Sequence, residues 1–122
     1  MIPTVQSVKV AQLRKIHGDS IDLEKWIQIP NNLYVGRRGR VFITEGNQKR
    51  VFHYPDSKWG NPYKGENCLQ LYEDHVRKNL YDQIGELANK TIGCFCVMKP
   101  YEQGIEPTCH THILVKLYIE SR

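Results

Sequence analysis

The longest regular pattern in the sequence is an amphipathic stretch over residues 67–88, which predicts a helix. Apolar side chains recur there at three- and four-residue steps, at positions 69, 72, 76, 80, 84 and 87, and this spacing places them on one face of a helix. Asn67 and Gln70 have the spacing of a capping box, and Gly85 is a point where the helix could bend or split. Such a helix must bury its apolar face against another element, so we expect the chain to build a core around it.

Shorter segments surround this helix. Alternating or continuous apolar residues predict strands at residues 7–13, 33–35, 41–44, 50–54 and 91–98. Gly46-Asn47 marks the turn of a hairpin between the third and fourth of these strands. Residues 19–29 predict a short helix that begins near Asp22. Residues 109–119 fit a helix and a strand equally well, and Thr108 as a helix N-cap favours the helix.

The order of these elements predicts the α/β class: one small domain over residues 1–122, with a mixed sheet of about four to five strands, two or three helices and an inserted hairpin. With 40% hydrophobic and 25% charged residues, the composition is that of a globular protein rather than a disordered one. No apolar run reaches the ~18–20 residues of a membrane helix, and residues 1–7 lack the plan of a signal peptide. We therefore expect an intracellular protein, monomeric or homodimeric, with no membrane partner.

Positive charge is concentrated in the first half of the chain. The net charge is +4, but residues 1–64 hold 11 Lys/Arg against 5 Asp/Glu, whereas residues 65–122 hold 6 against 8. This asymmetry favours an acidic partner such as a phosphate, a nucleotide or a nucleic acid. A solvated basic loop would give the same count, so both interpretations stay open.

Residues 34–64 combine these cations with aromatic side chains. Guanidinium groups clamp phosphates and aromatic faces stack on bases, and the glycine-rich turn Gly36-Arg37-Arg38-Gly39 would let backbone amides approach an anion. The turn matches neither a Walker loop nor a dinucleotide fingerprint. The stretch therefore predicts a site for a small phosphate-bearing molecule or nucleotide, and a basic nucleic-acid-binding accessory protein is the alternative.

The cysteines and two histidines form the densest group of reactive side chains. In a strand, Cys94 and Cys96 point to the same face, and His112 lies one helical turn from Cys109. Thiolate and neutral imidazole are the ligands that zinc prefers. The candidate zinc ligands are Cys94, Cys96, Cys109 and either His110 or His112.

Two other interpretations of this group remain open. Cys109 at a helix N-terminus, with His110 or His112 as base, would be a catalytic thiol–imidazole pair. Alternatively, the cysteines are buried packing residues and the histidines only form structural hydrogen bonds.

Several ordered motifs together resemble an uncharacterised family, domain of unknown function 4326, found in phages, other large DNA viruses and bacteria. The motifs are Tyr34-Val35-Gly36-Arg37, Ser57-Lys58-Trp59-Gly60-Asn61-Pro62-Tyr63, a Leu-Tyr helix around residues 69–72, Gly93-Cys94-Phe95-Cys96 and Cys109-His110. The resemblance covers about residues 33–120. It implies a small α/β domain of a viral type and no known activity.

The resemblance also implies which residues build a shared site. The matching positions are Gly36, Arg37, Ser57, Gly60, Asn61, Pro62, Cys94, Cys96, Cys109 and His110. The chain departs from the family pattern in a hairpin of about fifteen extra residues after Gly36-Arg37, in a longer loop before Cys109, and in His112, where members often have Asp. We expect one pocket, with Gly36, Arg37, Ser57, Gly60 and Asn61 binding the ligand beside the Cys/His group.

Overall fold

The computed structural model describes residues 2–18, 21–95 and 106–122 of the chain. In these ranges it confirms the predicted α/β class, with five strands, four α-helices and one 3-10 helix. In chain order they are β1 Thr4–Ser7, α1 Val10–His17, α2 Leu23–Gln28, β2 Asn32–Tyr34, β3 Gly39–Glu45, β4 Gln48–Tyr54, α3 Cys68–Asn79, η1 Tyr81–Leu87, β5 Thr91–Cys94 and α4 His110–Glu120. The strands divide between a three-stranded sheet and a separate two-stranded hairpin.

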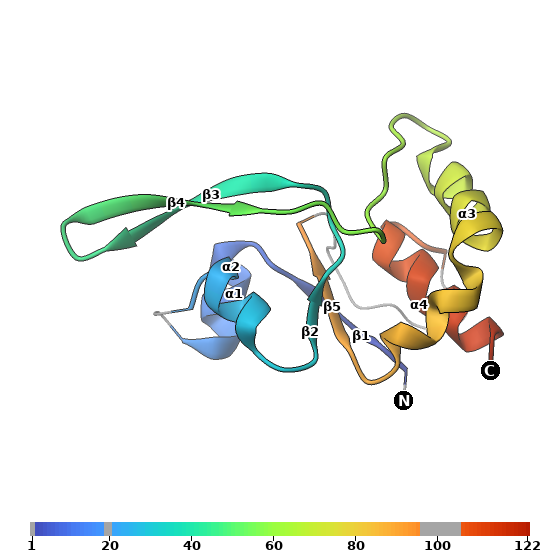
Figure 1. Cartoon of the computed structure of the whole chain (residues 1–122), viewed down its shortest axis with the longest axis horizontal. Helices are drawn as coiled ribbons and strands as arrows, with labels where there is room; N and C mark the ends of the chain where they lie inside the picture. Colours follow the sequence, from blue (N-terminus) through green and yellow to red (C-terminus); the bar gives the residue numbers. More distant parts are fainter. Residues whose placement is uncertain (1, 19–20, 96–105) are drawn as a thin grey trace.

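The three-stranded sheet is parallel throughout and has the order β1-β5-β2. Ile92 of the central strand is in register with Val5 on one side and Leu33 on the other. Figure 1 shows α1 and α2 on one side of this sheet and α3 and α4 on the other. The arrangement follows from parallel pairing, because parallel strands need crossover connections that place helices over the faces of the sheet.

The side chains of β5 alternate between two separate apolar clusters. Ile92 and Cys94 belong to the cluster formed with α3, η1 and α4. Gly93 points the other way, where a Cβ atom would lie 2.6 Å from both the Trp26 ring and Val8. Phe95 packs against that second cluster. Only glycine at position 93 lets α2 approach the central strand this closely.

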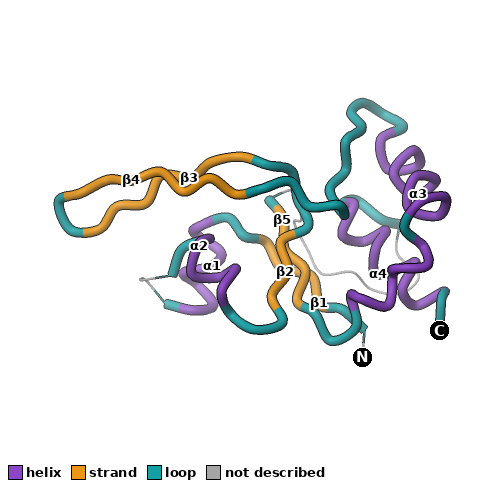
Figure 2. The backbone as a smooth tube through the Cα atoms, in the orientation of Figure 1, coloured by secondary structure: helices purple, strands orange, loops and turns teal. Residues whose placement is uncertain are grey.

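The predicted hairpin is confirmed as an arm that extends from the body (Figure 2). Its turn contains Gly46 with φ +60°, a conformation that glycine adopts without strain. Phe52 and Tyr54 pack their inner side against the cluster around Trp26. A bidentate ion pair between Arg50 of β4 and Glu24 of α2 also joins the arm to the body.

The strand predicted over residues 7–13 is wrong. The strand β1 ends at Ser7, and α1 begins at Val10. The alternation of Val8 and Val10 suggested a strand, but Val10 is exposed and begins a run of good helix formers. Leu13 is the buried residue of α1.

The helix predicted over residues 67–88 is divided in two at Leu80, not at Gly85. The α-helix α3 ends at Asn79 and the chain continues as the 3-10 helix η1. Asn67 is the N-cap residue, but its side chain makes no capping hydrogen bond, so the predicted capping box is wrong. The apolar positions nevertheless lie as predicted, because Tyr72, Val76, Ile84 and Leu87 all belong to the core.

The last segment of the chain is a helix, as Thr108 suggested. Its N-cap residue, however, is Cys109. The backbone amide of Thr108 instead donates to Nδ1 of His112, at 3.1 Å. Among the helices of residues 2–18, 21–95 and 106–122, none is long and apolar enough to span a bilayer.

Candidate functional site

A cavity of about 470 Å³ lies where β2 and β5 end. Ligand sites of α/β proteins commonly lie at the carboxyl ends of parallel strands, where the following loops diverge. The described residues that line it are Tyr34, Gly36, Arg37, Arg38, Tyr54, Asn61, Tyr63, Cys68, Leu69, Cys94, Phe95, Thr108, Cys109 and His110. The cavity therefore brings the early arginines, the Asn61 loop and the Cys109-His110 corner together.

Two thiols and one imidazole meet in the wall of this cavity. The sulfur atoms of Cys94 and Cys109 are 3.5 Å apart, and the Cys109 sulfur is 3.7 Å from Nδ1 of His110. The three side chains are buried, and their ligand atoms all lie within 4.8 Å of one another. They come from the end of β5, the N-cap of α4 and its first residue, so the parallel pairing and the start of α4 create the cluster.

A backbone carbonyl fixes the orientation of His110. Its Nε2 lies 2.7 Å from the carbonyl oxygen of Val35. Because a carbonyl can only accept a hydrogen bond, Nε2 is the donor, and in the neutral imidazole Nδ1 is then the acceptor nitrogen on the side of Cys109. The edge of the His110 ring also contacts Tyr72, whose ring centroid is 5.4 Å away. The imidazole is thus held with its basic nitrogen toward the two sulfurs.

The cluster can act in two chemical ways. Two thiolates and an oriented imidazole are a metal-ligating set, with the carbonyl of Val35 as the outer partner that metal-binding histidines commonly have. The same geometry gives Cys109 a neighbouring base, and a helix N-terminus favours its thiolate.

Arg37 holds the loop that forms the opposite wall. Its Nε donates to the carbonyl of Asn61 at 2.5 Å, and Nη2 donates to the carbonyl of Tyr63 at 2.8 Å. The side-chain oxygen of Asn61 accepts from the amide of Tyr63 at 2.9 Å, which closes a tight turn. Backbone carbonyls carry no formal charge, so the full positive charge of Arg37 remains at the cavity.

Ser57 and Gly60 support this wall from behind and are not among the residues that line the cavity. The amide of Ser57 donates to the carbonyl of Gly36, and its hydroxyl accepts from the amide of Trp59 at 3.1 Å. A Cβ atom at Gly60 would lie 2.9 Å from the Gly36 oxygen. These two residues hold the loops of residues 36–38 and 57–63 together, and their role toward a ligand stays a prediction.

Three aromatic rings form a further wall. The ring centroids of Tyr34 and Tyr54 are 5.1 Å apart, and Phe95 lies 6.2 Å from Tyr34 and 5.7 Å from Tyr54. Burial raises the pKa of Tyr54, and a hydrogen bond with Tyr34 offsets part of that rise. Tyr54 is therefore an uncharged phenol near neutral pH, and the wall is apolar with two hydroxyl groups.

Of the two histidines, His110 is the one whose ring lies beside Cys94 and Cys109. His112 is fully buried, does not line the cavity and directs Nδ1 to the amide of Thr108. Cys96 lies outside the described residues, so the full predicted ligand set of Cys94, Cys96, Cys109 and His112 stays a prediction.

Sequence reasoning missed several lining residues. Cys68 and Leu69 line the cavity, but nothing in the sequence links either residue to it. Phe95 alternates with Cys94 along β5, so its ring leaves the strand on the other side. Only the junction of the hairpin arm with β5 brings it beside Tyr34 and Tyr54.

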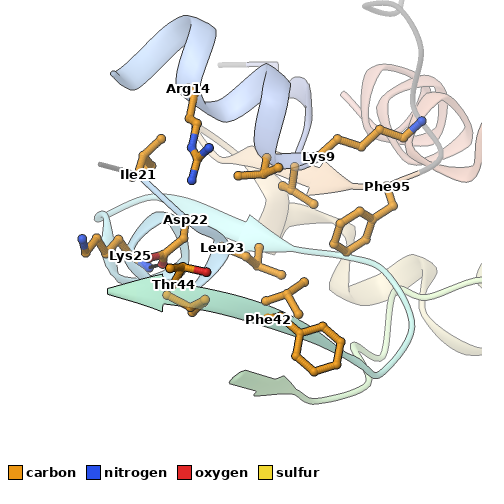
Figure 3. Close-up of a pocket in the computed structure, with 13 residues that line it drawn as sticks. Lys9, Arg14, Ile21, Asp22, Leu23, Lys25, Phe42, Thr44 and Phe95 are labelled. Carbon is orange, nitrogen blue, oxygen red and sulfur yellow. Dashed lines mark hydrogen bonds between the residues drawn. The ribbon is translucent and has the colours of Figure 1, made fainter. Parts of the chain in front are cut away.

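A second cavity, of about 590 Å³, lies between α1, α2 and β3 (Figure 3). Leu23, Phe95 and other apolar residues form most of its lining, and Arg14 extends toward it from α1. None of its described lining residues is a cysteine or a histidine. The reactive side chains therefore gather at the first cavity, which is the candidate functional site.

Comparison with known proteins agrees with the motifs at this site. A family model described as a domain of unknown function, DUF4326, matches residues 20–120. The chain belongs to the DUF4326 family. The family resemblance predicted from the sequence is thereby confirmed, and the matched range contains every residue of the candidate site.

One relative is the uncharacterised protein R718 of Acanthamoeba polyphaga mimivirus. It is 32% identical to this chain over 74 residues, which cover 55% of this chain and 57% of the relative. No solved structure matches the chain. This DUF4326 protein is thus similar to a protein of a large DNA virus.

Proposed function

We propose that this DUF4326 protein binds a small phosphate-bearing molecule, such as a nucleotide, in the cavity at the ends of β2 and β5. The observation that carries the proposal is the charge of the lining: Arg37 and Arg38 belong to it, and none of the described lining residues is acidic. A cavity with two cations and no carboxylate attracts an anion. The aromatic wall of Tyr34, Tyr54 and Phe95 offers a surface for a planar base.

We further propose that Cys94, Cys109 and His110 hold a zinc ion in the wall of this cavity. Tetrahedral zinc, with Zn–S of about 2.3 Å and Zn–N of about 2.0–2.1 Å, separates two sulfurs by about 3.8 Å and sulfur from nitrogen by about 3.6 Å. The corresponding distances here are 3.5 Å and 3.7 Å. These three ligands are the ones found among the described residues; the fourth position of a tetrahedral site would go to the predicted ligand Cys96, which lies outside them, or to a substrate or water.

Elemental analysis of the purified protein tests the metal. The expected result is about one zinc per chain, lost in Cys109→Ser and strongly reduced in His110→Gln. Cys68→Ser is the matched control, because Cys68 lines the same cavity but lies outside the three-residue group. Zinc content that is negligible in the folded wild-type protein, or equal in all variants, would contradict the zinc proposal.

Calorimetric titration with inorganic phosphate and a panel of nucleotides tests the ligand. Arg38→Gln should weaken binding of the preferred ligand by at least about tenfold, since a charge-assisted hydrogen bond contributes about 1.5–3 kcal/mol. Arg14→Gln removes the same charge at the other cavity and should leave the affinity unchanged. Equal losses in both variants would mean that overall charge, not this cavity, attracts the anion.

A second candidate function is catalysis with Cys109 as nucleophile. The specific observation is the Cys109–His110 pair with its third member, the Val35 carbonyl that orients the imidazole. In chelator-treated protein, iodoacetamide should alkylate Cys109 faster than Cys68, and His110→Gln should remove the difference. If Cys109 reacts no faster than Cys68, the nucleophile proposal is wrong.

A further inference from the structure

The hairpin arm has two faces with different chemistry. Because strand side chains alternate, Val41, Phe52 and Tyr54 pack toward the body, while the cross-strand pairs between them point outward. The outward residues are Arg40, Phe42 and Thr44 of β3 and Lys49, Val51 and His53 of β4. All six are exposed. We call this set the outer face of the arm.

The centre of the outer face is apolar and open to solvent. Phe42 is 70% exposed and its cross-strand partner Val51 is 40% exposed. Phe42 also belongs to the lining of the second cavity, and in Figure 3 its ring lies well away from Arg14 of α1. A single exposed apolar side chain is common, but Phe42 and Val51 lie side by side and form an apolar patch that a partner can cover.

Basic side chains surround this patch. Arg40, paired across the strands with His53, lies on one side of it, and Lys49 lies on the other side. The guanidinium of Arg40 is 5.8 Å from the centre of the Phe42 ring. None of the six residues of the outer face is acidic, so the face combines an exposed aromatic ring with uncompensated positive charge.

The positive charge continues toward the base of the arm. Arg38, Arg40 and His53 line a shallow hollow there. Asp56 also lines it, and its carboxylate accepts a hydrogen bond from the amide of Arg38 at 2.6 Å. Arg40 and Arg38 thus connect the arm with the mouth of the first cavity, which Arg38 also lines.

We infer that the outer face of the arm binds single-stranded nucleic acid, with an unpaired base on the Phe42 ring and phosphates at Arg40 and Lys49. Aromatic side chains flanked by cations are the arrangement that proteins use for single strands. A duplex hides its base faces in stacking, so an exposed ring on a strand fits unpaired bases better. A second copy of the chain would present the same cations to this face, and like charges oppose that contact.

The length of the face limits the contact to a few nucleotides. Arg40 and Thr44 are four residues apart, which is about 14 Å along a strand. Two or three phosphate contacts give a slope of log affinity against log salt of about −1.4 to −2. The binding is therefore weak and depends on salt. It is independent of the ligand proposed for the cavity.

Fluorescence anisotropy with labelled oligothymidylate and oligouridylate of about 20 nucleotides tests the inference in full-length protein. Phe42→Ala should weaken binding about 5- to 150-fold, the range for loss of one base–aromatic stack. Arg40→Gln should reduce the salt slope by about 0.7.

The controls lie on α3, away from the arm. Leu71→Ala removes another exposed apolar side chain, and Lys78→Gln removes another exposed cation; both should bind as the wild type does. The inference is overturned if Phe42→Ala binds as well as Leu71→Ala, or if Lys78→Gln changes the salt slope as much as Arg40→Gln. It is also overturned if Phe42→Ala only converts a dimer to a monomer, or if duplex DNA binds as tightly as the single strands. Thermal melts should show every variant folded, since all four side chains are exposed.

Discussion

The close approach of α2 to the central strand makes Gly93→Ala the sharpest test of the fold. The added Cβ atom would lie 2.6 Å from the Trp26 ring and 2.6 Å from a methyl carbon of Val8. Ordinary contacts begin at about 3.4 Å, so these atoms must shift by most of an ångström. Trp26 and Val8 are buried at 0% and 1% exposure, so neither can move into solvent.

The magnitude follows from overpacking and chain entropy. Overpacking a core costs about 1–3 kcal/mol, and two buried contacts place this site in the upper part of that range. Replacing glycine by alanine lowers the conformational entropy of the unfolded chain, which stabilises the folded state by about 0.4–1 kcal/mol. The net loss in the free energy of unfolding is therefore about 1–2.5 kcal/mol. With roughly 2.1 cal/mol/K of unfolding entropy per residue, the 122-residue chain should melt about 4–10 °C lower.

Differential scanning calorimetry measures this loss. Gly85→Ala is the matched control, because its Cβ would meet only the end of the flexible Arg122 side chain; its melting temperature should not fall. Val8→Ala in the Gly93→Ala background should recover part of the loss, so the two changes together cost less than their sum. A Gly93→Ala protein that melts with the wild type, or strict additivity with Val8→Ala, would refute the packing argument.

Three further predictions concern single side chains. Asp22 caps α2 through a hydrogen bond to a backbone amide of 2.9 Å, so Asp22→Ala should cost about 1 kcal/mol in urea unfolding, while a loss below 0.3 kcal/mol would exclude the cap. Burial raises the pKa of Glu73, but hydrogen bonds from Lys116 and Arg77 outweigh this and leave the pKa below its ordinary value. The ionised Glu73 therefore stabilises the folded state above about pH 4.3, and this stabilisation is lost as the pH falls further. In Glu73→Gln, the free energy of unfolding should depend less on pH in this acidic range. Arg37→Gln should speed hydrogen exchange at the amides of Asn61 and Tyr63, because Arg37 holds the carbonyls of these two residues; unchanged exchange would mean that the loop is rigid without it.

Local pattern predicted most of the elements. Alternation with a Gly46-Asn47 turn specifies a hairpin, and three- and four-residue spacing specifies the apolar face of residues 69–87; both patterns are properties of the chain itself. The errors lie where local signals are weak. Over residues 7–13 two valines imitate a strand, and only tertiary packing, which buries Val8 and Leu13 but exposes Val10, decides between strand and helix.

The candidate site was only partly predictable. Arg37, Cys109 and His110 could be named because glycine-rich turns, thiols and imidazoles are chemically distinctive in a sequence, whereas Asn61 was implied only by the family resemblance. The orientation of His110 beside Cys109 depends on the Val35 carbonyl, 75 residues away along the chain. The aromatic wall likewise depends on where the arm joins the body, which no local pattern specifies.

The sequence by itself determined which segments form helices and strands, which residues carry charge or reactive sulfur, and which family the chain resembles. The tertiary structure alone decided which of these residues face one another. The physical reason is that periodicity and turn chemistry act over a few residues, whereas the parallel register of β5 between β1 and β2 fixes contacts between distant segments. That register places Cys94 beside Cys109 and Arg37 across the same cavity.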